Sequence, residues 1–402
     1  MRFLLLGKGK SIKYIKKYIK SNKDEVIHAV FEHEYNSNYV LANEKLLEIE
    51  DIDYAIKSPG ISETNQLYLR LSRKFKFISE LDLLSIYNIK TKSIVVTGSN
   101  GKTTFVSMLK FLFDKLNIKS IICGNSFDPI SKYFKQFNKV NYLIIEQSSF
   151  QLHDLKMYSP LISIILNLQE NHLDMSYSLN SYFNNKMNIY KYQNKECYFI
   201  YDSNNRHLKI NRTNANIVEL LNYDNFDSIS NELLKYKNNI NYLYTIFRIL
   251  NLNLNIIERI NEFKQLKYRN TKKIVKDTLF VNDSKSTSVD SILFSLSQFQ
   301  NHENIILIIG GRNKNLSFNR LNEYKLGKII AYGELKDKIN INNLIKAKTL
   351  YNAFNIATNI ELAEKIILFS PGCSSFDSFD SYVDRGKYFD RLVKKYEKIK
   401  EY

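Results

Sequence analysis

A buried strand that ends in a glycine turn and continues as a helix is the feature that most constrains this 402-residue chain. The segment reads Ile94-Val95-Val96-Thr97-Gly98-Ser99-Asn100-Gly101-Lys102-Thr103-Thr104, and helical apolar spacing continues to about Leu116. Glycines allow backbone N–H groups to point toward an anion, and the helix N-terminus adds positive potential. Lys102 can reach terminal phosphates, and the Thr103 hydroxyl can hold Mg²⁺. This order of elements predicts an α/β domain built around a phosphate site.

One position departs from the general P-loop pattern. That pattern has a glycine five residues before Gly101, and Val96 stands there. The loop is therefore a shorter form in which only Gly98 and Gly101 precede Lys102. A Gly-Lys-Thr triplet after apolar residues can arise by chance, but the flanking strand and helix favour nucleotide binding.

The chain is strongly basic, with 58 Lys and Arg against 41 Asp and Glu, a formal charge of +17. Such a charge suits nucleic acid, a membrane surface or anionic small molecules. A composition with abundant lysine and tyrosine, four prolines and no tryptophan fits an AT-biased coding sequence as well. Because the lysines are spread along the chain and not gathered in one arm, we predict no nucleic-acid partner.

The cysteines and the apolar runs indicate the cellular compartment in which the protein works. Cys123, Cys197 and Cys373 lie far apart without metal-ligand spacing, which indicates a reducing environment. The apolar run at residues 3–6 is too short for a signal sequence, and no run approaches a membrane span. The sequence therefore predicts a cytoplasmic protein with no membrane insertion.

Other predicted strands also end in residues that serve nucleotide chemistry. The strand at 142–145 precedes Glu146, where nucleotide enzymes place a Mg²⁺ ligand, although a solvent-facing carboxylate is the alternative. The strand at 161–166 leads toward His172, at the sheet edge where α/β sites assemble. Lys186 lies in a predicted helix at 182–190 and is, by itself, a solvated helix lysine.

The two ends of the chain show similar β/α alternation. Residues 2–6 form a predicted strand before Gly7-Lys8-Gly9-Lys10-Ser11, a start that suits a phosphate site but lacks the third glycine of the dinucleotide fingerprint. In the final third, four apolar strands precede glycine or small polar residues, at 279–281, 305–309, 328–332 and 366–369. We predict three domains, each an open, mostly parallel sheet with flanking helices, at 1–91, 92–265 and 266–402.

Six motifs follow one another in a recognisable order: Thr97–Thr104, Glu146–Leu152, Asn171–Asp174, Asn282–Thr287, Gly310-Gly311 with Lys314, and Ser370–Asp377. Together they resemble the motifs of the Mur ligases over nearly the whole chain. The phosphate loop identifies only the superfamily. The runs Ser148–Leu152, Asn282–Thr287 and Ser370–Asp377 point to the branch of the family that adds D-glutamate.

The resemblance implies a fold and a reaction. The expected domains are a Rossmann-like UDP-substrate-binding domain, a central P-loop ATPase domain and a Rossmann-like amino-acid-binding domain. The expected reaction is ATP-dependent addition of D-glutamate to UDP-N-acetylmuramoyl-L-alanine through an acyl phosphate, with two Mg²⁺ sites. The family also implies a monomer.

The resemblance assigns residues to nucleotide and metal. It implies ATP binding by Gly98, Ser99, Asn100, Gly101, Lys102, Thr103, Thr104, Asn238, Arg269 and Asp283, the last at the ribose. It implies one Mg²⁺ held by Thr103 and Glu146 and a second supported by His172 and a carbamylated Lys186. Lys102, His172 and Lys186 are the expected catalytic residues.

The resemblance also assigns residues to the two acceptor substrates. Gly7, Lys10, Ser11 and Gly60 fall at the expected uridine-diphosphate site, and Asn125 falls at a substrate contact. The expected D-glutamate site comprises Lys285, Thr287, Lys314, Ser375, Phe376 and Tyr382.

Departures from the family pattern leave alternatives open. Asn171, Lys237 and Tyr268 stand where the family usually has aspartate, histidine and histidine. The alternatives are a Mur-type or folylpolyglutamate-type ligase with another acceptor, an inactive ligase, and a basic P-loop protein that binds nucleic acid.

Overall fold

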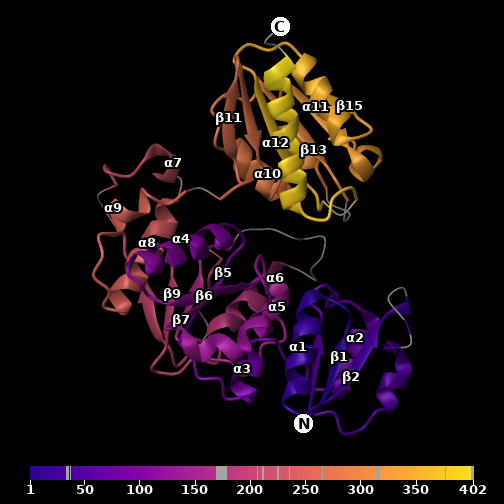
Figure 1. The fold of residues 1–402 in the computed structure, drawn as a ribbon, viewed down its shortest axis with the longest axis vertical. Helices are drawn as coiled ribbons and strands as arrows, with labels where there is room; N and C mark the ends of the chain where they lie inside the picture. Colours follow the sequence, from indigo (N-terminus) through magenta and orange to yellow (C-terminus); the bar gives the residue numbers. More distant parts are fainter. Residues whose placement is uncertain are drawn as a thin grey trace. The chain divides into compact units, whose positions relative to one another are not determined.

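Three sheets, each flanked by helices, organise the computed structural model of the chain (Figure 1). The structure describes residues 1–32, 36, 38–168, 179–205, 207–210, 212–223, 226–234, 236–264, 266–312, 317–375 and 377–399. The chain forms two compact units, Met1–Phe263 and Lys264–Tyr402. The three-sheet α/β architecture confirms the predicted fold class.

The N-terminal sheet has the order β3-β2-β1-β4, and all of its pairs are parallel. Its strands are β1 (Arg2–Leu6), β2 (Glu25–Val30), β3 (Val40–Leu41) and β4 (Tyr54–Lys57). Because side chains alternate along a strand, Phe3 and Leu5 pack with α1 (Lys10–Ser21), whereas Leu4 and Leu6 pack with α2 (Gln66–Lys74). Both faces of the sheet are therefore covered.

The central sheet is parallel throughout, in the order β10-β9-β8-β5-β7-β6. Its strands are β5 (Ser93–Thr97), β6 (Ser120–Gly124), β7 (Tyr142–Glu146), β8 (Ile162–Ile165), β9 (Tyr198–Tyr201) and β10 (Asn216–Glu219). The surrounding helices are α3 (Asp82–Ile86), α4 (Lys102–Lys115), α5 (Ser149–Leu152), α6 (Leu179–Met187), α7 (Asn231–Leu234), α8 (Lys237–Ile249) and α9 (Ile256–Ile260).

The first two sheets belong to one compact unit and share a core. Side chains of β1 and α1 fall in the same apolar cluster as Val95 of β5 and Leu143 of β7. Asp82 strengthens this association, since its buried carboxylate accepts backbone N–H bonds from Met157 (2.8 Å) and Tyr158 (3.0 Å). The start of α3 is thus tied to the loop that follows α5.

The C-terminal sheet has the order β11-β12-β16-β13-β14-β15, parallel except for β11 against β12. Its strands are β11 (Thr271–Val275), β12 (Thr278–Asn282), β13 (Ile305–Gly310), β14 (Lys328–Tyr332), β15 (Leu344–Lys346) and β16 (Ile366–Gly372). Residues 305, 307 and 309 pack with α10 (Val289–Leu296), and residues 306 and 308 pack with α11 (Leu350–Asn359) and α12 (Tyr382–Ile399). Short 3₁₀ helices lie at Glu44–Glu48, Ile130–Lys139, Asn188–Tyr190, Asn319–Glu323 and Gly333–Asp337.

The structure explains the departure at Val96. Val96 is fully buried within β5 and pairs with Glu146 on one side and Ile164 on the other. The strand therefore continues to Thr97, and the turn begins only at Gly98. A glycine at position 96 has no role in a loop of this length.

Candidate phosphate and amino-acid sites

Two glycines give the predicted phosphate loop its shape. Gly101 has φ +81° and precedes α4, and this left-handed conformation favours glycine. A Cβ atom on Gly98 would approach Leu166 Cβ to 3.1 Å. The loop thus delivers the chain to the N-terminus of a fourteen-residue helix, where backbone N–H groups can bind an anion.

Asn167 braces this loop, a role that the sequence analysis missed. The Ser99 N–H donates to the Asn167 backbone oxygen (2.9 Å), and the Asn100 N–H donates to Asn167 Oδ1 (2.9 Å). Asn167 Nδ2 donates in return to the Asn100 carbonyl (3.1 Å). The sequence did contain a signal for this role, because a polar residue follows β8. This strand lies parallel to β5 and beside it.

Lys102 and Lys186 meet at the same point of the loop. Lys102 Nζ donates to the carbonyls of Gly98 (2.6 Å) and Ser99 (3.0 Å), and Lys186 Nζ donates to the Gly98 carbonyl (2.9 Å). Lys186 also lies 4.5 Å from the centre of the Tyr182 ring. Lys102 thereby places positive charge at the loop, where an anionic ligand would bind.

The environment of Lys186 corrects the expectation of a solvated helix lysine. Its side chain comes from α6, and the residue is only 1% exposed. Burial, followed by repulsion from Lys102, holds the pKa of Lys186 well below its ordinary value, and Glu146 opposes this shift. A depressed amine pKa is typical of a group that does chemistry.

Glu146 forms the acidic side of the site at the end of β7. Its Oε1 accepts hydrogen bonds from Asn125 Nδ2 (2.8 Å) and Ser126 Oγ (2.9 Å), and Ser126 Oγ in turn accepts one from Thr103 Oγ1 (3.1 Å). Glu146 is 1% exposed, yet its Oε2 has no hydrogen-bond partner among the described residues. The predicted solvent-facing alternative for Glu146 is therefore wrong.

The donor set here suits Mg²⁺. Thr103 Oγ1 and the unpaired Glu146 Oε2 are oxygen atoms, the type of ligand that Mg²⁺ prefers. Within the described ranges, no cluster of three or more His, Cys, Asp or Glu side chains could hold a metal by itself. A Mg²⁺ at this point would accordingly need phosphate oxygens and water as well. His172 lies outside the described residues.

The residues predicted for uridine diphosphate flank the ends of β1 and β4. Gly7 follows β1, and Ser11 lies in the first turn of α1 and lines a cavity of about 20 Å³ with Pro59 and Gln151. Lys10 Nζ donates to Asp128 Oδ1 (2.5 Å), and with Lys132 it holds the pKa of Asp128 below its usual range. Gly60 is exposed, with open space around its Cβ position.

The nucleotide residues predicted outside the loop lie in different settings. Asn238 is exposed on α8, whereas its neighbour Asn239 is buried, with Oδ1 3.6 Å from the Cβ position of Gly101. Asp283 is buried after β12 and accepts hydrogen bonds from Ser295 Oγ (2.6 Å) and Ser370 Oγ (3.1 Å). Burial raises the pKa of Asp283 to about 6, and the charge of Arg269 partly opposes this.

Of the residues predicted for D-glutamate, Lys285 and Tyr382 are in contact in the C-terminal unit. Lys285 Nζ lies 4.5 Å from the centre of the Tyr382 ring, Ser375 is buried, and Thr287 is exposed. Lys314 and Phe376 lie outside the described residues.

Arg385 connects the loops of this region and was not predicted. Its side chain is fully buried on α12. Nε and Nη2 donate to Ser284 Oγ (3.1 Å) and the Ser284 carbonyl (2.8 Å), and Nη1 donates to the Cys373 carbonyl (3.0 Å). One guanidinium therefore joins the loop after β12 to the loop after β16.

Comparison with known proteins shows sequence similarity to one family along most of the chain. The Mur ligase middle domain matches residues 96–261. A Francisella philomiragia protein named UDP-N-acetylmuramoylalanine--D-glutamate ligase is 32% identical over 372 residues, covering 86% of this chain and 87% of the relative. A protein of the same name from Francisella tularensis subsp. novicida is 31% identical over 412 residues, covering 98% and 95%.

Solved structures share the fold at low sequence identity. MurF from Acinetobacter baumannii superposes with a TM-score of 0.57 at 15% identity, covering 96% of this chain and 90% of that one. MurF ligase from Thermotoga maritima in complex with ADP gives 0.55 at 14% identity, covering 98% and 94%. Among the described residues, no helix is both long enough and apolar enough to cross a membrane.

Proposed function

The chain belongs to the Mur ligase family, and from this premise we propose that it joins D-glutamate to UDP-N-acetylmuramoyl-L-alanine, the reaction of the D-glutamate-adding branch (MurD). The reaction consumes ATP and yields a peptidoglycan precursor. One observation carries the proposal: Lys102 and Lys186 converge on the phosphate loop beside Glu146, a buried carboxylate with one oxygen unpaired among the described residues.

In the first step, the alanine carboxylate of the substrate attacks the γ-phosphorus of ATP. A carboxyl O–P bond forms, the bond to the ADP oxygen breaks, and the product is an acyl phosphate. Lys102 stabilises the phosphoryl oxygens, and the loop N–H groups bind the remaining phosphates. Thr103 and Glu146 would hold Mg²⁺, which neutralises phosphate charge when bound, with His172 as the proposed ligand of a second ion.

The depressed pKa of Lys186 supports its proposed carbamylation. A neutral amine adds CO₂ to form a carbamate and releases one proton, whereas a protonated amine cannot. The product is an anion at the position of Lys186, so repulsion from Lys102 becomes attraction. This carbamate would support the second metal.

In the second step, the amine of D-glutamate attacks the acyl carbon. The tetrahedral intermediate collapses to an amide, and the phosphate leaves with the bonding electron pair and takes up the proton that the amine nitrogen releases. We assign the amino acid to Lys285, Thr287, Lys314, Ser375, Phe376 and Tyr382. The cation at Lys285, next to Tyr382, suits a dicarboxylate ligand.

The remaining assignments follow the same proposal. Gly7, Lys10, Ser11, Gly60 and Asn125 are assigned to the UDP-sugar substrate, and Asn238, Arg269 and Asp283 to the nucleotide. Asn125 also orients Glu146 through its amide. We further propose a monomer that works in the cytoplasm.

A phosphate-release assay tests the function. We expect release only when ATP, UDP-N-acetylmuramoyl-L-alanine and D-glutamate are all present, and a loss of about 10³-fold or more in Lys102→Ala. L-glutamate, meso-diaminopimelate and L-lysine are the matched acceptors. Faster turnover with one of them would identify another Mur-type ligase, and full activity in Lys102→Ala would refute the mechanism.

A further inference from the structure

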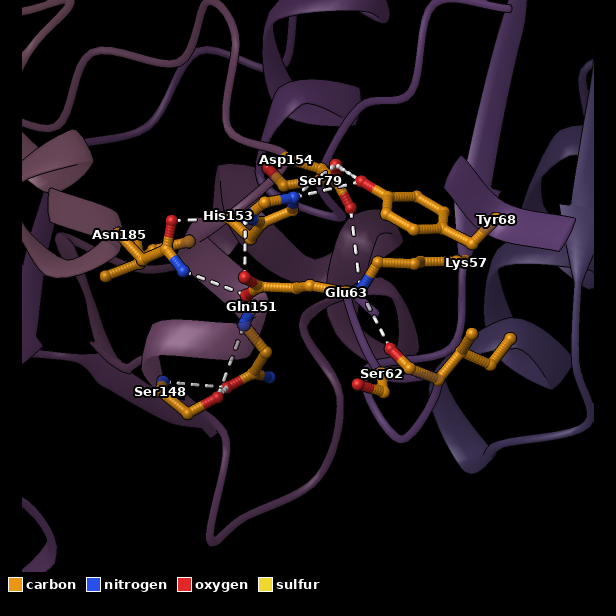
Figure 2. A network of polar contacts seen from close by, with 12 residues as sticks. Lys57, Ser62, Glu63, Tyr68, Ser79, Ser148, Gln151, His153, Asp154 and Asn185 are labelled. Atoms are coloured by element: carbon orange, nitrogen blue, oxygen red, sulfur yellow. Dashed lines mark hydrogen bonds and ion pairs between the residues drawn. The ribbon is translucent and has the colours of Figure 1, made fainter. Parts of the chain in front are cut away.

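A buried polar network joins the N-terminal sheet to helices α5 and α6 of the central sheet (Figure 2). The N-terminal side contributes Lys57 at the end of β4, Glu63 in the following loop and Tyr68 of α2. The central side contributes His153 and Asp154 after α5 and Asn185 of α6. None of these residues is assigned a role above, and Lys57 and Asp154 line the same small cavity as Ser11.

Glu63 lies at the middle of this network and is 3% exposed. Its Oε1 accepts a hydrogen bond from Asn185 Nδ2 (2.8 Å), and its Oε2 lies 3.2 Å from His153 Nδ1. The amide of Asn185 is therefore oriented with its nitrogen toward the carboxylate, and its Oδ1 faces His153 Nδ1 at 3.1 Å. Glu63, Asn185 and His153 form a closed triangle.

The far side of His153 completes the arrangement. Tyr68 OH donates to Asp154 Oδ1 (2.7 Å), so its oxygen is the acceptor that faces His153 Nε2 at 3.0 Å. Both ring nitrogens thus face oxygen atoms of neighbouring side chains. Lys57 Nζ lies 3.7 Å from Asp154 Oδ2 and forms an ion pair with this carboxylate. These hydrogen bonds and the buried ion pair make this a specific contact between the two sheets.

Asn185 links this network to the phosphate loop because it precedes Lys186 on α6. Successive helix residues point about 100° apart. Asn185 can therefore contact Glu63 while Lys186 contacts the Gly98 carbonyl. Asn188 Nδ2 donates to the Leu152 carbonyl (3.1 Å) and ties the end of α6 to α5. Rotation of α6 that released Asn185 would also displace Lys186 Nζ.

We propose that Glu63 is a positioning residue for Lys186: its hydrogen bond to Asn185 sets the rotation of α6 and so holds Lys186 Nζ at the phosphate loop. The inference rests on the proposed ligase function. A carboxylate from the N-terminal sheet thereby completes a site whose other parts come from the central sheet. Displacement of a catalytic group by about 1 Å can cost on the order of 10²-fold in rate, so the effect should fall on kcat and not on the KM for ATP.

A charge exchange between the two partners tests the proposal. Asn185→Asp removes the N–H donor and places two carboxylates face to face, so it should lower kcat by about 10-fold or more. Glu63→Gln alone keeps an oxygen that can accept from Asn185 Nδ2, so it should lower kcat by less than about 3-fold. The double variant Glu63→Gln/Asn185→Asp restores an amide opposite a carboxylate and leaves a carboxylate next to His153. We expect its kcat to return to within about 3-fold of the wild type, with the KM for ATP nearly constant throughout.

Glu80→Gln is the matched control for loosened contact between the sheets. Glu80 also crosses this interface, since its Oε1 accepts from the N–H (2.8 Å) and Oγ (2.5 Å) of Ser131, but these contacts do not involve α6. Glu80→Gln should leave kcat within about 2-fold of the wild type even where its melting temperature falls as far as that of Asn185→Asp.

Two results would overturn the positioning role of Glu63. One is a double variant whose loss in kcat equals the product of the losses in the two single variants. The other is a loss of kcat in Glu80→Gln as large as that in Asn185→Asp. Failure of the ligase function itself is distinguishable, because the wild-type protein would then release no phosphate with the two substrates.

Discussion

The central and C-terminal sheets both bury charged residues at the carboxyl ends of their strands, but they treat these charges differently. In the C-terminal sheet, Asp283 is bonded by two serine hydroxyls, and Arg385 donates to three acceptor atoms. In the central sheet, Glu146 Oε2 has no hydrogen-bond partner in the part of the chain that the structure describes, and Lys186 has its pKa strongly lowered.

This difference distinguishes buried charges that maintain the fold from buried charges that bind a ligand. A buried charge whose hydrogen bonds are all made by protein groups, as in Arg385, fixes the loops that it joins, and its removal leaves buried partners unpaired. A buried charge left incompletely satisfied costs stability, and such groups persist where a ligand completes the pairing. We therefore assign Arg385 to the architecture of its loops and Glu146 to the binding of a cation.

Arg385→Met should have the largest effect on stability. The substitution leaves the Ser284 and Cys373 carbonyls buried without their donor, at a cost of about 3–5 kcal/mol. Denaturant unfolding of the full-length protein measures the change. Arg391→Met, an exposed position on the same helix, is the control and should cost less than about 0.5 kcal/mol. Equal stabilities of the two variants would contradict a structural role for Arg385.

Glu146→Gln should show the opposite pattern, with activity lost and stability kept. The amide still accepts bonds from Asn125 and Ser126 but loses the charge that a metal needs, so we expect kcat to fall by about 100-fold or more. The free energy of unfolding should stay within about 1 kcal/mol of the wild type. Kinetics across a Mg²⁺ titration, paired with denaturant unfolding, measure both quantities. A variant that unfolds easily yet keeps its kcat would place Glu146 with the scaffold.

Asp283→Asn tests how the buried carboxylate of Asp283 makes the free energy of unfolding depend on pH. Burial raises the pKa of Asp283 from 3.8 to about 6, so the folded state binds this proton more tightly than the unfolded state does. The group therefore destabilises the fold progressively as the pH rises from about 4 to above 6, by on the order of 3 kcal/mol at neutral pH.

The amide introduced by Asp283→Asn cannot titrate, so this variant should gain stability over the wild type across this pH range. Unfolding free energies of both proteins at several pH values between about 4 and 7 provide the test. A difference that does not change with pH would mean that folding leaves the pKa of Asp283 unshifted.

The sequence predicted the strands that lie in the middle of the sheets. Apolar runs at 94–97, 142–145 and 305–309 are buried on both faces, and all three form strands. Edge strands such as β10 and β11 were missed because they are short and carry polar residues such as Asn216 and Lys272. One face of such a strand meets solvent, so its composition resembles that of a loop.

The candidate site was predictable only where a motif is local. Lys102 and Thr103 follow the glycines within one turn of chain, so neighbouring residues determine their surroundings. Other features depend on residues far away in the chain. These are the burial of Lys186, the hydrogen bonds of Asn167 to the phosphate loop and the hydrogen bonds of Arg385 to two loops. No periodicity in one segment can report such contacts.

The smallest predicted effect distinguishes two neighbouring asparagines. The family resemblance assigns nucleotide contact to Asn238, which is exposed, whereas the buried Asn239 lies beside Gly101. Asn239 Nδ2 lacks a hydrogen-bond partner within the described ranges, the same signature as Glu146 Oε2. By that criterion Asn239→Ala should raise the KM for ATP by about 10-fold, the value of one hydrogen bond, and Asn238→Ala by less than about 2-fold. Initial rates against ATP concentration measure both KM values. A larger effect at Asn238 would show that the unsatisfied buried amide of Asn239 does not mark a ligand contact. The motif position would then be the better predictor of nucleotide contact.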